Sequence, residues 1–308
     1  MRGRWLAALG FLLLVGMVSG GCVAPQAEEG KLRVVATTTI VGDVVRHIGG
    51  ETVALTVLLP PGADPHAFEA TPQDMARVAE ADLLFVNGAG LETFLDPLLE
   101  NAGGHAEVID LSQGVPLRAF REKIAAGEAA EEAPPDPHVW TDPNNVLIWT
   151  ETIEQALSDA DPTNADRYRH NAAAYREHLH SLDAWIRDEV AQVPPERRLL
   201  VTDHLFLGYF ADRYGFEQIG AVIPGYTTVS SPSAQELATL EEAIRQYGVP
   251  AVFVGATVNP ALAEQVARDT GVKLVPIYTG SLTGPDGDAP TYLDYMRYDV
   301  QAIVEALR

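Results

Sequence analysis

Short apolar runs rich in β-branched residues alternate with helical patterns along the chain from Leu32 onward. Alternation of this kind predicts βαβ units and therefore parallel sheets. The strands expected in the first half are Arg33–Ala36, Val53–Leu58, Asp82–Val86 and Glu107–Ile109. Those expected in the second half are Leu199–Thr202, Gln218–Val222, Ala251–Val254 and Lys273–Ile277. The pattern indicates two α/β lobes, one in each half of the chain.

Capping signals mark where several helices begin. Thr71 is an expected N-cap with Pro72 at the first helical position. Ser233 and Glu236 have capping-box spacing, and the helix that they open should end before Gly248. Further helices are expected to open at Asn259-Pro260, which Gly271 closes, and at Asp142-Pro143, and to occupy Leu205–Tyr214.

One segment predicts an unusually long helix, because neither Gly nor Pro occurs between Thr163 and Val193. Apolar residues recur there at helical spacing, at Tyr168, Ala172, Tyr175, Leu179, Leu182, Ile186 and Val190. Thr163 and Asp166 are expected to cap the start, and Pro194-Pro195 to end the helix. About 28 residues at 1.5 Å each would span roughly 40 Å. The predicted fold is α/β: an N-terminal lobe over 31–162, a linking helix over 163–193 and a C-terminal lobe over 194–308. Each lobe should hold a mostly parallel sheet flanked by helices.

The N-terminus predicts export from the cytoplasm. Arg2 and Arg4 precede an apolar stretch over 5–18 that is too short to span a bilayer comfortably. The only cysteine, Cys22, follows small residues, and one cysteine excludes an internal disulfide. This region resembles a bacterial lipoprotein signal, although Ser19 replaces the usual aliphatic residue. The resemblance implies that 1–21 is a signal peptide, that Cys22 is lipidated, and that 22–30 is a tether.

Composition narrows the possible partners. The 308 residues include 21 Lys+Arg and 43 Asp+Glu, giving a formal net charge of −22. General binding to nucleic acid or anionic lipid needs clustered Lys and Arg, so this acidic composition argues against an affinity for either. The acidic segment Arg121–Pro137, which has few large apolar residues, is expected to be a mobile surface loop.

Three of the eight histidines occupy positions that suit metal binding. His66 and His138 each end an Asp-Pro-His motif, and His204 follows the expected strand Leu199–Thr202. Open α/β sheets bind ligands beyond the carboxyl ends of their strands, and neutral imidazole suits zinc and neighbouring divalent ions. The Asp of each motif could accept the second N–H of its histidine. Three unrelated loop histidines are the alternative. The remaining five histidines are expected to be structural: His47, His105, His170, His178 and His180.

These motifs resemble the zinc/manganese solute-binding lipoproteins of bacterial ABC transporters, whose two lobes share a rigid helix. The resemblance covers nearly the whole mature chain. It is carried by the segments 35–40, 61–69, 136–143, 202–210, 222–225 and 291–296.

The resemblance implies a ligand set. His66 and His138 would bind the metal from the N-terminal lobe and His204 from the C-terminal lobe, and histidine at this third position favours zinc over manganese. The family's usual fourth ligand, an Asp, is replaced by Gly280, and a usual Glu is replaced by Gly255. Water, Glu69, Asp286 or Asp288 could complete the coordination, and weaker binding than in four-ligand relatives is expected.

The expected function is that of a monomeric, lipid-anchored, extracytoplasmic protein at the cell surface or in the periplasm. It would capture Zn²⁺, or Mn²⁺, as a transport substrate and deliver it to an ABC permease. The chain has no Gly-rich nucleotide-binding motif, so the ATPase must be a separate subunit. We expect no enzymatic activity. The alternatives are a metal-dependent hydrolase with three histidines and a water, and a surface adhesion lipoprotein.

Overall fold

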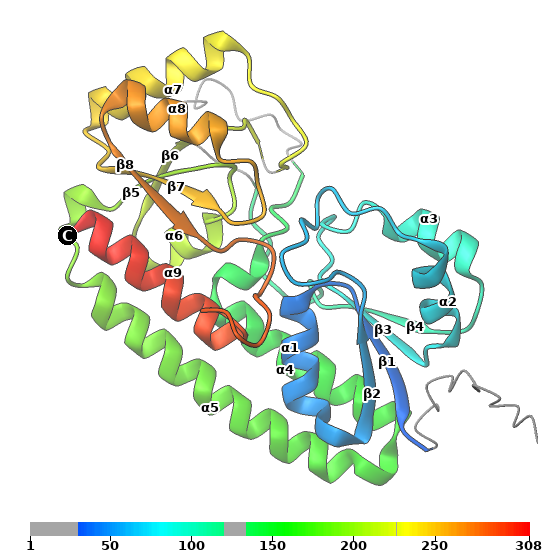
Figure 1. The fold of residues 1–308 in the computed structure, drawn as a ribbon. Coiled ribbons are helices and arrows are strands. Elements are labelled where there is room, and N and C mark those ends of the chain that lie inside the picture. The colour runs from blue at the N-terminus through cyan, green and yellow to red at the C-terminus, as the bar shows by residue number, and fades with distance from the viewer. Residues whose placement is uncertain (1–29, 120–133, 226) are drawn as a thin grey trace, which may run out of the picture. The chain divides into compact units, whose positions relative to one another are not determined.

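Two parallel four-stranded sheets organise the chain in the computed structural model, which describes residues 30–119, 134–225 and 227–308 (Figure 1). The first sheet contains β1 (Leu32–Ala36), β2 (Val53–Val57), β3 (Leu83–Val86) and β4 (Glu107–Asp110), in the order β2-β1-β3-β4. The second contains β5 (Leu199–Thr202), β6 (Glu217–Ala221), β7 (Ala251–Gly255) and β8 (Lys273–Ile277), in the order β6-β5-β7-β8. Each expected strand is confirmed to within one residue at either end.

Helices follow the strands in both halves. Those of the first half are α1 (Thr39–Gly49), α2 (Pro72–Glu80), α3 (Leu95–Ala102) and α4 (Pro143–Ala160). The linking helix is α5 (Ala165–Val190), and the second half adds α6 (Gly208–Tyr214), α7 (Ala234–Tyr247), α8 (Ala261–Thr270) and α9 (Tyr292–Leu307). We call β1–β4 with α1–α4 the N-terminal lobe, and β5–β8 with α6–α9 the C-terminal lobe.

Alternation along the strands builds a layered core. Ala36 and Phe85 point to the sheet face that shares a core with α1, α4 and α5, whereas Val35 and Leu84 point to the face covered by α2 and α3. The C-terminal sheet repeats this arrangement, since Phe253 belongs to the central core and its neighbour Val252 to the core under α7 and α8. The central core is therefore shared by both lobes.

The long helix is confirmed, but it begins and ends at other residues than expected. α5 packs against α4 and α1 of the N-terminal lobe and against α9 of the C-terminal lobe, as Figure 1 shows. The seven apolar positions that predicted it are all buried. Thr163 does not cap it, however: Thr163 lies in a 3₁₀ turn (Pro162–Asn164), and the Asp161 carboxylate orders that turn by accepting hydrogen bonds from Asn164 and Tyr168. The helix also ends at Val190, before the two prolines.

Two other expectations need correction near the carboxyl ends of the strands. α6 begins at Gly208 rather than Leu205, because the Leu205 N–H donates to the Gly225 carbonyl and the segment continues as a loop. The expected surface loop over 121–137 ends in buried residues, because the Asp136 carboxylate pairs with Arg118. Residues 121–133 lie outside the described residues.

The expected signal peptide (1–21), Cys22 and nearly all of the tether (22–30) also lie outside the described residues. Residues Lys31–Arg308 form one compact unit, so the lobe boundaries at 162 and 194 stay a prediction. Within the described part of the chain, no helix is long and apolar enough to cross a membrane.

Candidate metal centre

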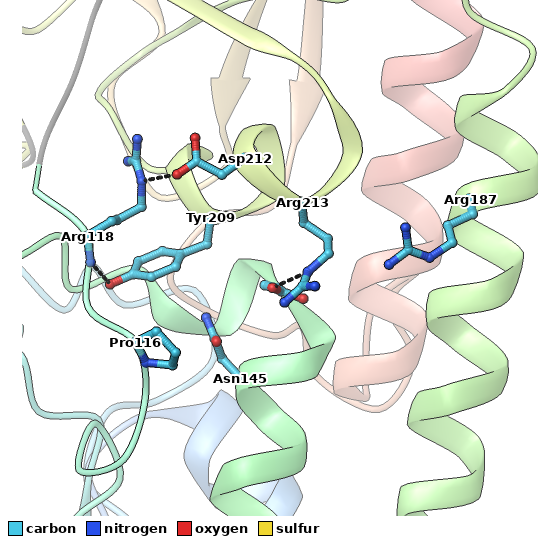
Figure 2. A pocket seen from close by; sticks show the side chains of 8 residues that line it. Pro116, Arg118, Asn145, Arg187, Tyr209, Asp212 and Arg213 are labelled. Carbon is cyan, nitrogen blue, oxygen red and sulfur yellow. Dashed lines mark hydrogen bonds and ion pairs between the residues drawn. The ribbon is translucent and has the colours of Figure 1, made fainter.

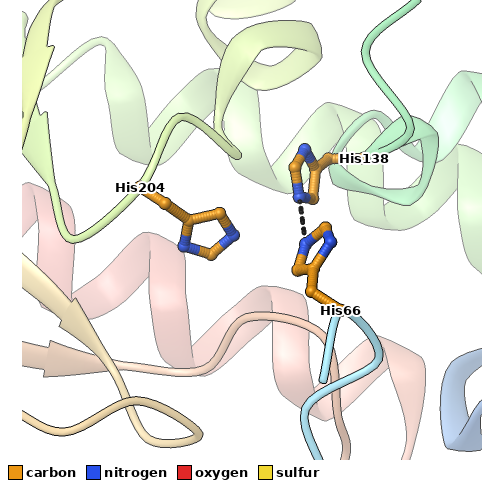
Figure 3. Close-up of side chains that lie close together, drawn as sticks. All are labelled: His66, His138 and His204. Atoms are coloured by element: carbon orange, nitrogen blue, oxygen red, sulfur yellow. Dashed lines mark hydrogen bonds between the residues drawn. The ribbon is translucent and has the colours of Figure 1, made fainter. Parts of the chain in front are cut away.

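The three motif histidines converge from three separate segments of the chain. His66 lies in the loop between β2 and α2, His138 just before α4, and His204 two residues after β5. Each offers a ring nitrogen, and the three nitrogens lie within 4.8 Å of one another (Figure 3). The Nε2 atoms of His66 and His138 are 3.1 Å apart, and the three ring centroids are separated by 5.2 to 5.4 Å. We call these three side chains the histidine cluster.

The cluster is largely shielded from water, and burial lowers the pKa of two of its three histidines. His138 and His204 are only 1% and 2% exposed, and His66 is half-buried. Burial, followed by the proximity of His138 and His204, lowers the pKa of His66 to about 2. Burial likewise lowers the pKa of His138, against the opposing effect of Asp136. Neutral imidazole is the form that binds metal ions.

One nitrogen of the cluster points to a ligand directly. The Nε2 atom of His204 is buried and has no hydrogen-bond partner in the part of the chain that the structure describes. A buried polar atom without a partner costs about 1–3 kcal/mol, so such atoms are rare in native proteins. A bound cation would satisfy this nitrogen, which supports a metal centre over three unrelated loop histidines.

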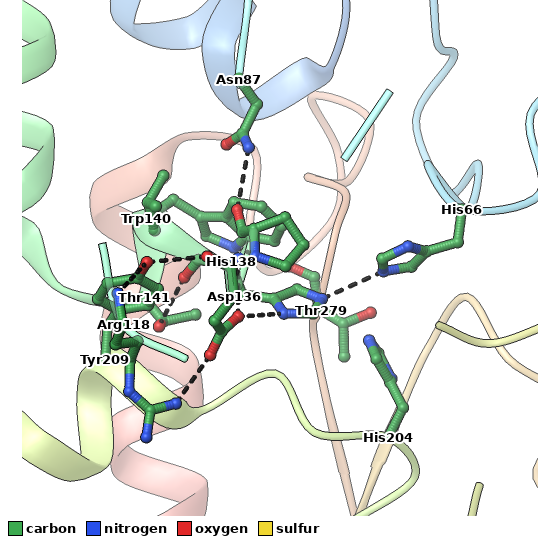
Figure 4. Close-up of polar contacts among 12 residues, drawn as sticks. His66, Asn87, Arg118, Asp136, His138, Trp140, Thr141, His204, Tyr209 and Thr279 are labelled. Carbon is green, nitrogen blue, oxygen red and sulfur yellow. Dashed lines mark hydrogen bonds and ion pairs between the residues drawn. The ribbon is translucent and has the colours of Figure 1, made fainter. Parts of the chain in front are cut away.

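Contacts from both lobes hold His138 in place (Figure 4). Its Nδ1 lies 2.8 Å from Asp136 Oδ1, and its Nε2 faces the Nε2 of His66 within the cluster. Asn87, at the end of β3, donates to the Pro137 carbonyl at 2.9 Å. From α6, Tyr209 donates to the Asp136 carbonyl at 2.8 Å. His138 is thus fixed where the two lobes meet.

The Asp of the first Asp-Pro-His motif behaves differently from that of the second. Asp64 accepts the backbone N–H of His66 and the hydroxyl of Thr228, and neither bond involves the imidazole ring. The expected Asp–imidazole contact therefore occurs in the second motif only. His204 has an equivalent, since Asp203 Oδ1 lies 3.2 Å from its Nδ1.

Sequence reasoning missed four residues that support the cluster. Asp203 had a signal, because it directly precedes His204, whereas Asn87, Arg118 and Tyr209 are each at least 20 residues from His138 in the sequence. Nothing local in the sequence connects those three residues with His138.

The carboxylates considered as a fourth ligand do not join the histidine cluster. Glu69, Asp286 and Asp288 are exposed, and among the described residues the group of candidate ligands contains the three imidazoles alone. At Gly280, a Cβ would lie 2.7 Å from the Pro65 ring, because the two lobes meet closely there.

A separate cavity of about 270 Å³ lies beside α4, α5 and α6 (Figure 2). Three arginines line it, and each one is paired with acids of the chain: Arg118 with Asp136 and Asp212, Arg187 with Asp183, and Arg213 with Asp142. Each of the three arginines therefore already has an acidic partner within the chain. Its connection to the cluster is Arg118, which reaches Asp136 at 2.9 Å.

Comparison with known proteins places this geometry in a family. A family model described as "zinc-uptake complex component A periplasmic" matches residues 34–306. The chain is 32% identical to the manganese ABC transporter substrate-binding lipoprotein PsaA of Streptococcus mitis, covering 97% of this chain and 96% of the relative. It is 31% identical to the iron-binding protein YfeA of Yersinia pestis, covering 91% and 88%.

A solved structure has a similar fold. The periplasmic zinc-binding protein TroA of Treponema pallidum superposes with a TM-score of 0.81 at 29% identity, covering 90% of this chain and 99% of that chain. The two lobes and the histidine cluster are therefore found in a chain that belongs to the zinc-uptake component A family, a family of metal-binding solute-binding proteins of ABC transporters and not of enzymes.

Proposed function

We propose that this protein captures Zn²⁺ outside the cytoplasm through His66, His138 and His204 and delivers it to an ABC permease. The observation that carries the proposal is the convergence of three imidazoles within 4.8 Å, one of them with a buried nitrogen that has no hydrogen-bond partner among the described residues. Two of these ligands come from the N-terminal lobe and one from the C-terminal lobe. A cation bound between them would join the lobes, and separation of the lobes would release it.

The donor atoms favour zinc over manganese. Zinc accepts tetrahedral coordination by imidazole nitrogens, whereas manganese suits carboxylate, carbonyl and water oxygens. The relatives are named for manganese, iron or zinc, so their names do not identify the metal. With three nitrogens and no carboxylate in the group, a water molecule is the fourth ligand that we expect.

The proposal includes a place and partners. The charged and apolar pattern of residues 1–21 supports export, and Cys22 would carry the lipid anchor, as in the lipoprotein relatives. A permease and a separate ATPase would complete the transporter, with this protein acting as a monomer. A hydrolase is not proposed, since the family binds and transfers metal and does not perform catalysis.

Competition between metals tests the proposal. Purified metal-free protein is titrated with zinc and with manganese against a chromophoric chelator, alongside His204→Ala and the exposed-residue control His178→Ala. We expect one zinc ion per chain, tighter binding of zinc than of manganese, and a loss in zinc affinity of at least about 100-fold in His204→Ala, because losing a ligand should exceed the loss of an outer contact. Unchanged zinc affinity in His204→Ala would overturn the assignment.

A further inference from the structure

Three neutral imidazoles leave the charge of a bound divalent cation uncompensated. A buried charge is costly unless groups of opposite charge lie close by. Carboxylates behind the ligands are therefore as important to this site as the ligands themselves. Among the described residues, two buried carboxylates face an imidazole of the histidine cluster, namely those of Asp136 and Asp203.

Asp136 is already partnered by a cation. Its Oδ2 receives Arg118 Nη1 at 2.9 Å, while its Oδ1 faces His138 Nδ1 at 2.8 Å. The guanidinium offsets most of the negative charge that Asp136 would otherwise offer to a metal ion. The effect of Asp136 is therefore mainly to orient the His138 ring.

Asp203 has no such partner. Its side chain is 4% exposed, and its Oδ1 accepts the His204 backbone N–H at 2.9 Å and faces the ring Nδ1 at 3.2 Å. Its Oδ2 accepts the Gly255 N–H at 3.2 Å. No Lys or Arg in the described part of the chain forms an ion pair with Asp203, so its negative charge is available to the site.

Gly255 provides the space for this carboxylate. Gly255 ends β7, next to β5, whose end leads into Asp203. A Cβ at this position would lie 2.4 Å from Thr279 Cγ2 and 3.0 Å from Asp203 Oδ2, distances that require a shift of the surrounding groups. The absence of a side chain at 255 thus allows the Asp203 carboxylate to reach the backbone N–H.

We propose that Asp203 is a positioning residue for the bound metal, seated by Gly255. It holds the His204 ring with Nε2 directed into the histidine cluster, and it supplies the buried negative charge that the three imidazoles lack. This inference rests on the proposed function, and it accounts for the orientation that leaves His204 Nε2 without a hydrogen-bond partner among residues 30–119, 134–225 and 227–308.

The test separates charge from hydrogen bonding. Asp203→Asn keeps an acceptor for the ring N–H but removes the charge, whereas Asp203→Ala removes both. We expect zinc affinity, measured by chelator competition, to fall about 10- to 100-fold in Asp203→Asn. In ¹⁵N NMR spectra of metal-free protein, His204 should show the Nδ1–H tautomer in the unmodified chain and a tautomer mixture in Asp203→Ala. A structural role alone would not move the tautomer.

Asp43→Asn is the matched control. The Asp43 carboxylate is also buried, accepts a backbone N–H from Tyr292 at 2.9 Å and lies 3.5 Å from a histidine ring, that of His47, which is outside the cluster. The zinc affinity of Asp43→Asn should stay within about threefold of that of the unmodified protein, since Asp43 contacts none of the three histidines of the cluster. Should Asp203→Asn fail to fold, Gly255→Ala replaces it, because displacing the carboxylate should also weaken zinc binding.

The outcomes distinguish this inference from the function on which it rests. If the unmodified protein does not bind zinc through the three histidines, the proposed function fails. If it does, and Asp203→Asn binds zinc as tightly as Asp43→Asn with an unchanged His204 tautomer, only the role of Asp203 is overturned.

Discussion

At the scale of single residues, the protein lowers the pKa of two histidines of the cluster below that of free histidine. The pKa of His66 is lowered to about 2 and that of His138 is also lowered, in both cases mainly by burial. In the unfolded chain both return to about 6.5. Below that pH the unfolded chain binds more protons than the folded chain, so the free energy of unfolding decreases as the pH falls from about 6.5 towards 2.

We therefore predict that the stability of the unmodified protein and that of His66→Gln depend differently on pH. Urea unfolding of metal-free protein should give a lower free energy of unfolding at pH 5.5 than at pH 7.5, by up to about 1.4 kcal/mol per pH unit for each histidine. In His66→Gln, the free energy of unfolding should decrease less between pH 7.5 and pH 5.5, because one titrating group has been removed. Burial raises the pKa of some carboxyl groups, such as Asp299, and these groups increase the free energy of unfolding as the pH falls. Their contribution is the same in both proteins, so it cancels when the two are compared. Equal losses in both proteins would contradict the pKa assignment of His66.

At the scale of elements, a short segment after β8 connects the two lobes beside the metal centre. Ser281 Oγ accepts the Gly62 N–H at 2.8 Å, and the Leu282 N–H donates to Thr39 Oγ1, also at 2.8 Å. Gly280 faces the Pro65 ring so closely that a Cβ would lie 2.7 Å from two of its carbons. The loop that carries His66 therefore packs against a glycine of the opposite lobe.

A side chain at position 280 should consequently weaken zinc binding. Gly280→Ala overpacks the contact with Pro65, at a cost of about 1–3 kcal/mol, which corresponds to roughly 5- to 150-fold in zinc affinity if the lobes must close. Gly280→Asp meets the same contact but adds a carboxylate, so its affinity should exceed that of Gly280→Ala. Gly284→Ala is the control, since its Cβ would meet nothing within 4 Å. Chelator competition measures all three, and equal affinities for Gly280→Ala and Gly284→Ala would refute the close contact.

The elements were predictable where the signal is local. Short runs rich in β-branched residues located the eight expected strands to within one residue at either end, and the 3.6-residue period located the buried face of α5. The predicted start of α6 was wrong because Leu205 binds Gly225, a residue outside the helix segment. The predicted start of α5 was wrong because the nearby Asp161 carboxylate orders the turn before it. The site divides in the same way: three histidines stand out by their motifs, whereas Arg118 reaches Asp136 through a contact with no local signal.

At the scale of the whole molecule, one core joins the lobes. The buried face of α5 belongs to the same apolar cluster as strands from both sheets, including Phe85 of β3 and Phe253 of β7. Residues Lys31–Arg308 accordingly form one compact unit. Motion between the lobes must therefore bend or slide against a continuous core, which limits its extent.

A destabilising substitution in α5 should lower the stability of both lobes together. Leu182→Ala removes a fully buried side chain and should lower the free energy of unfolding by about 2–5 kcal/mol. His178→Ala, on the exposed face of the same helix, should change it by no more than about 0.5 kcal/mol. Urea unfolding followed by tryptophan fluorescence and by circular dichroism should give coincident transitions. Two separate transitions would show that the lobes unfold independently.

The most direct test of the central claim is an anomalous diffraction measurement at the zinc edge on zinc-loaded crystals. The account predicts one strong peak per chain, about 2.0–2.1 Å from a ring nitrogen of each of His66, His138 and His204. A zinc ion bound away from these three side chains, or held by fewer than all three, would contradict it.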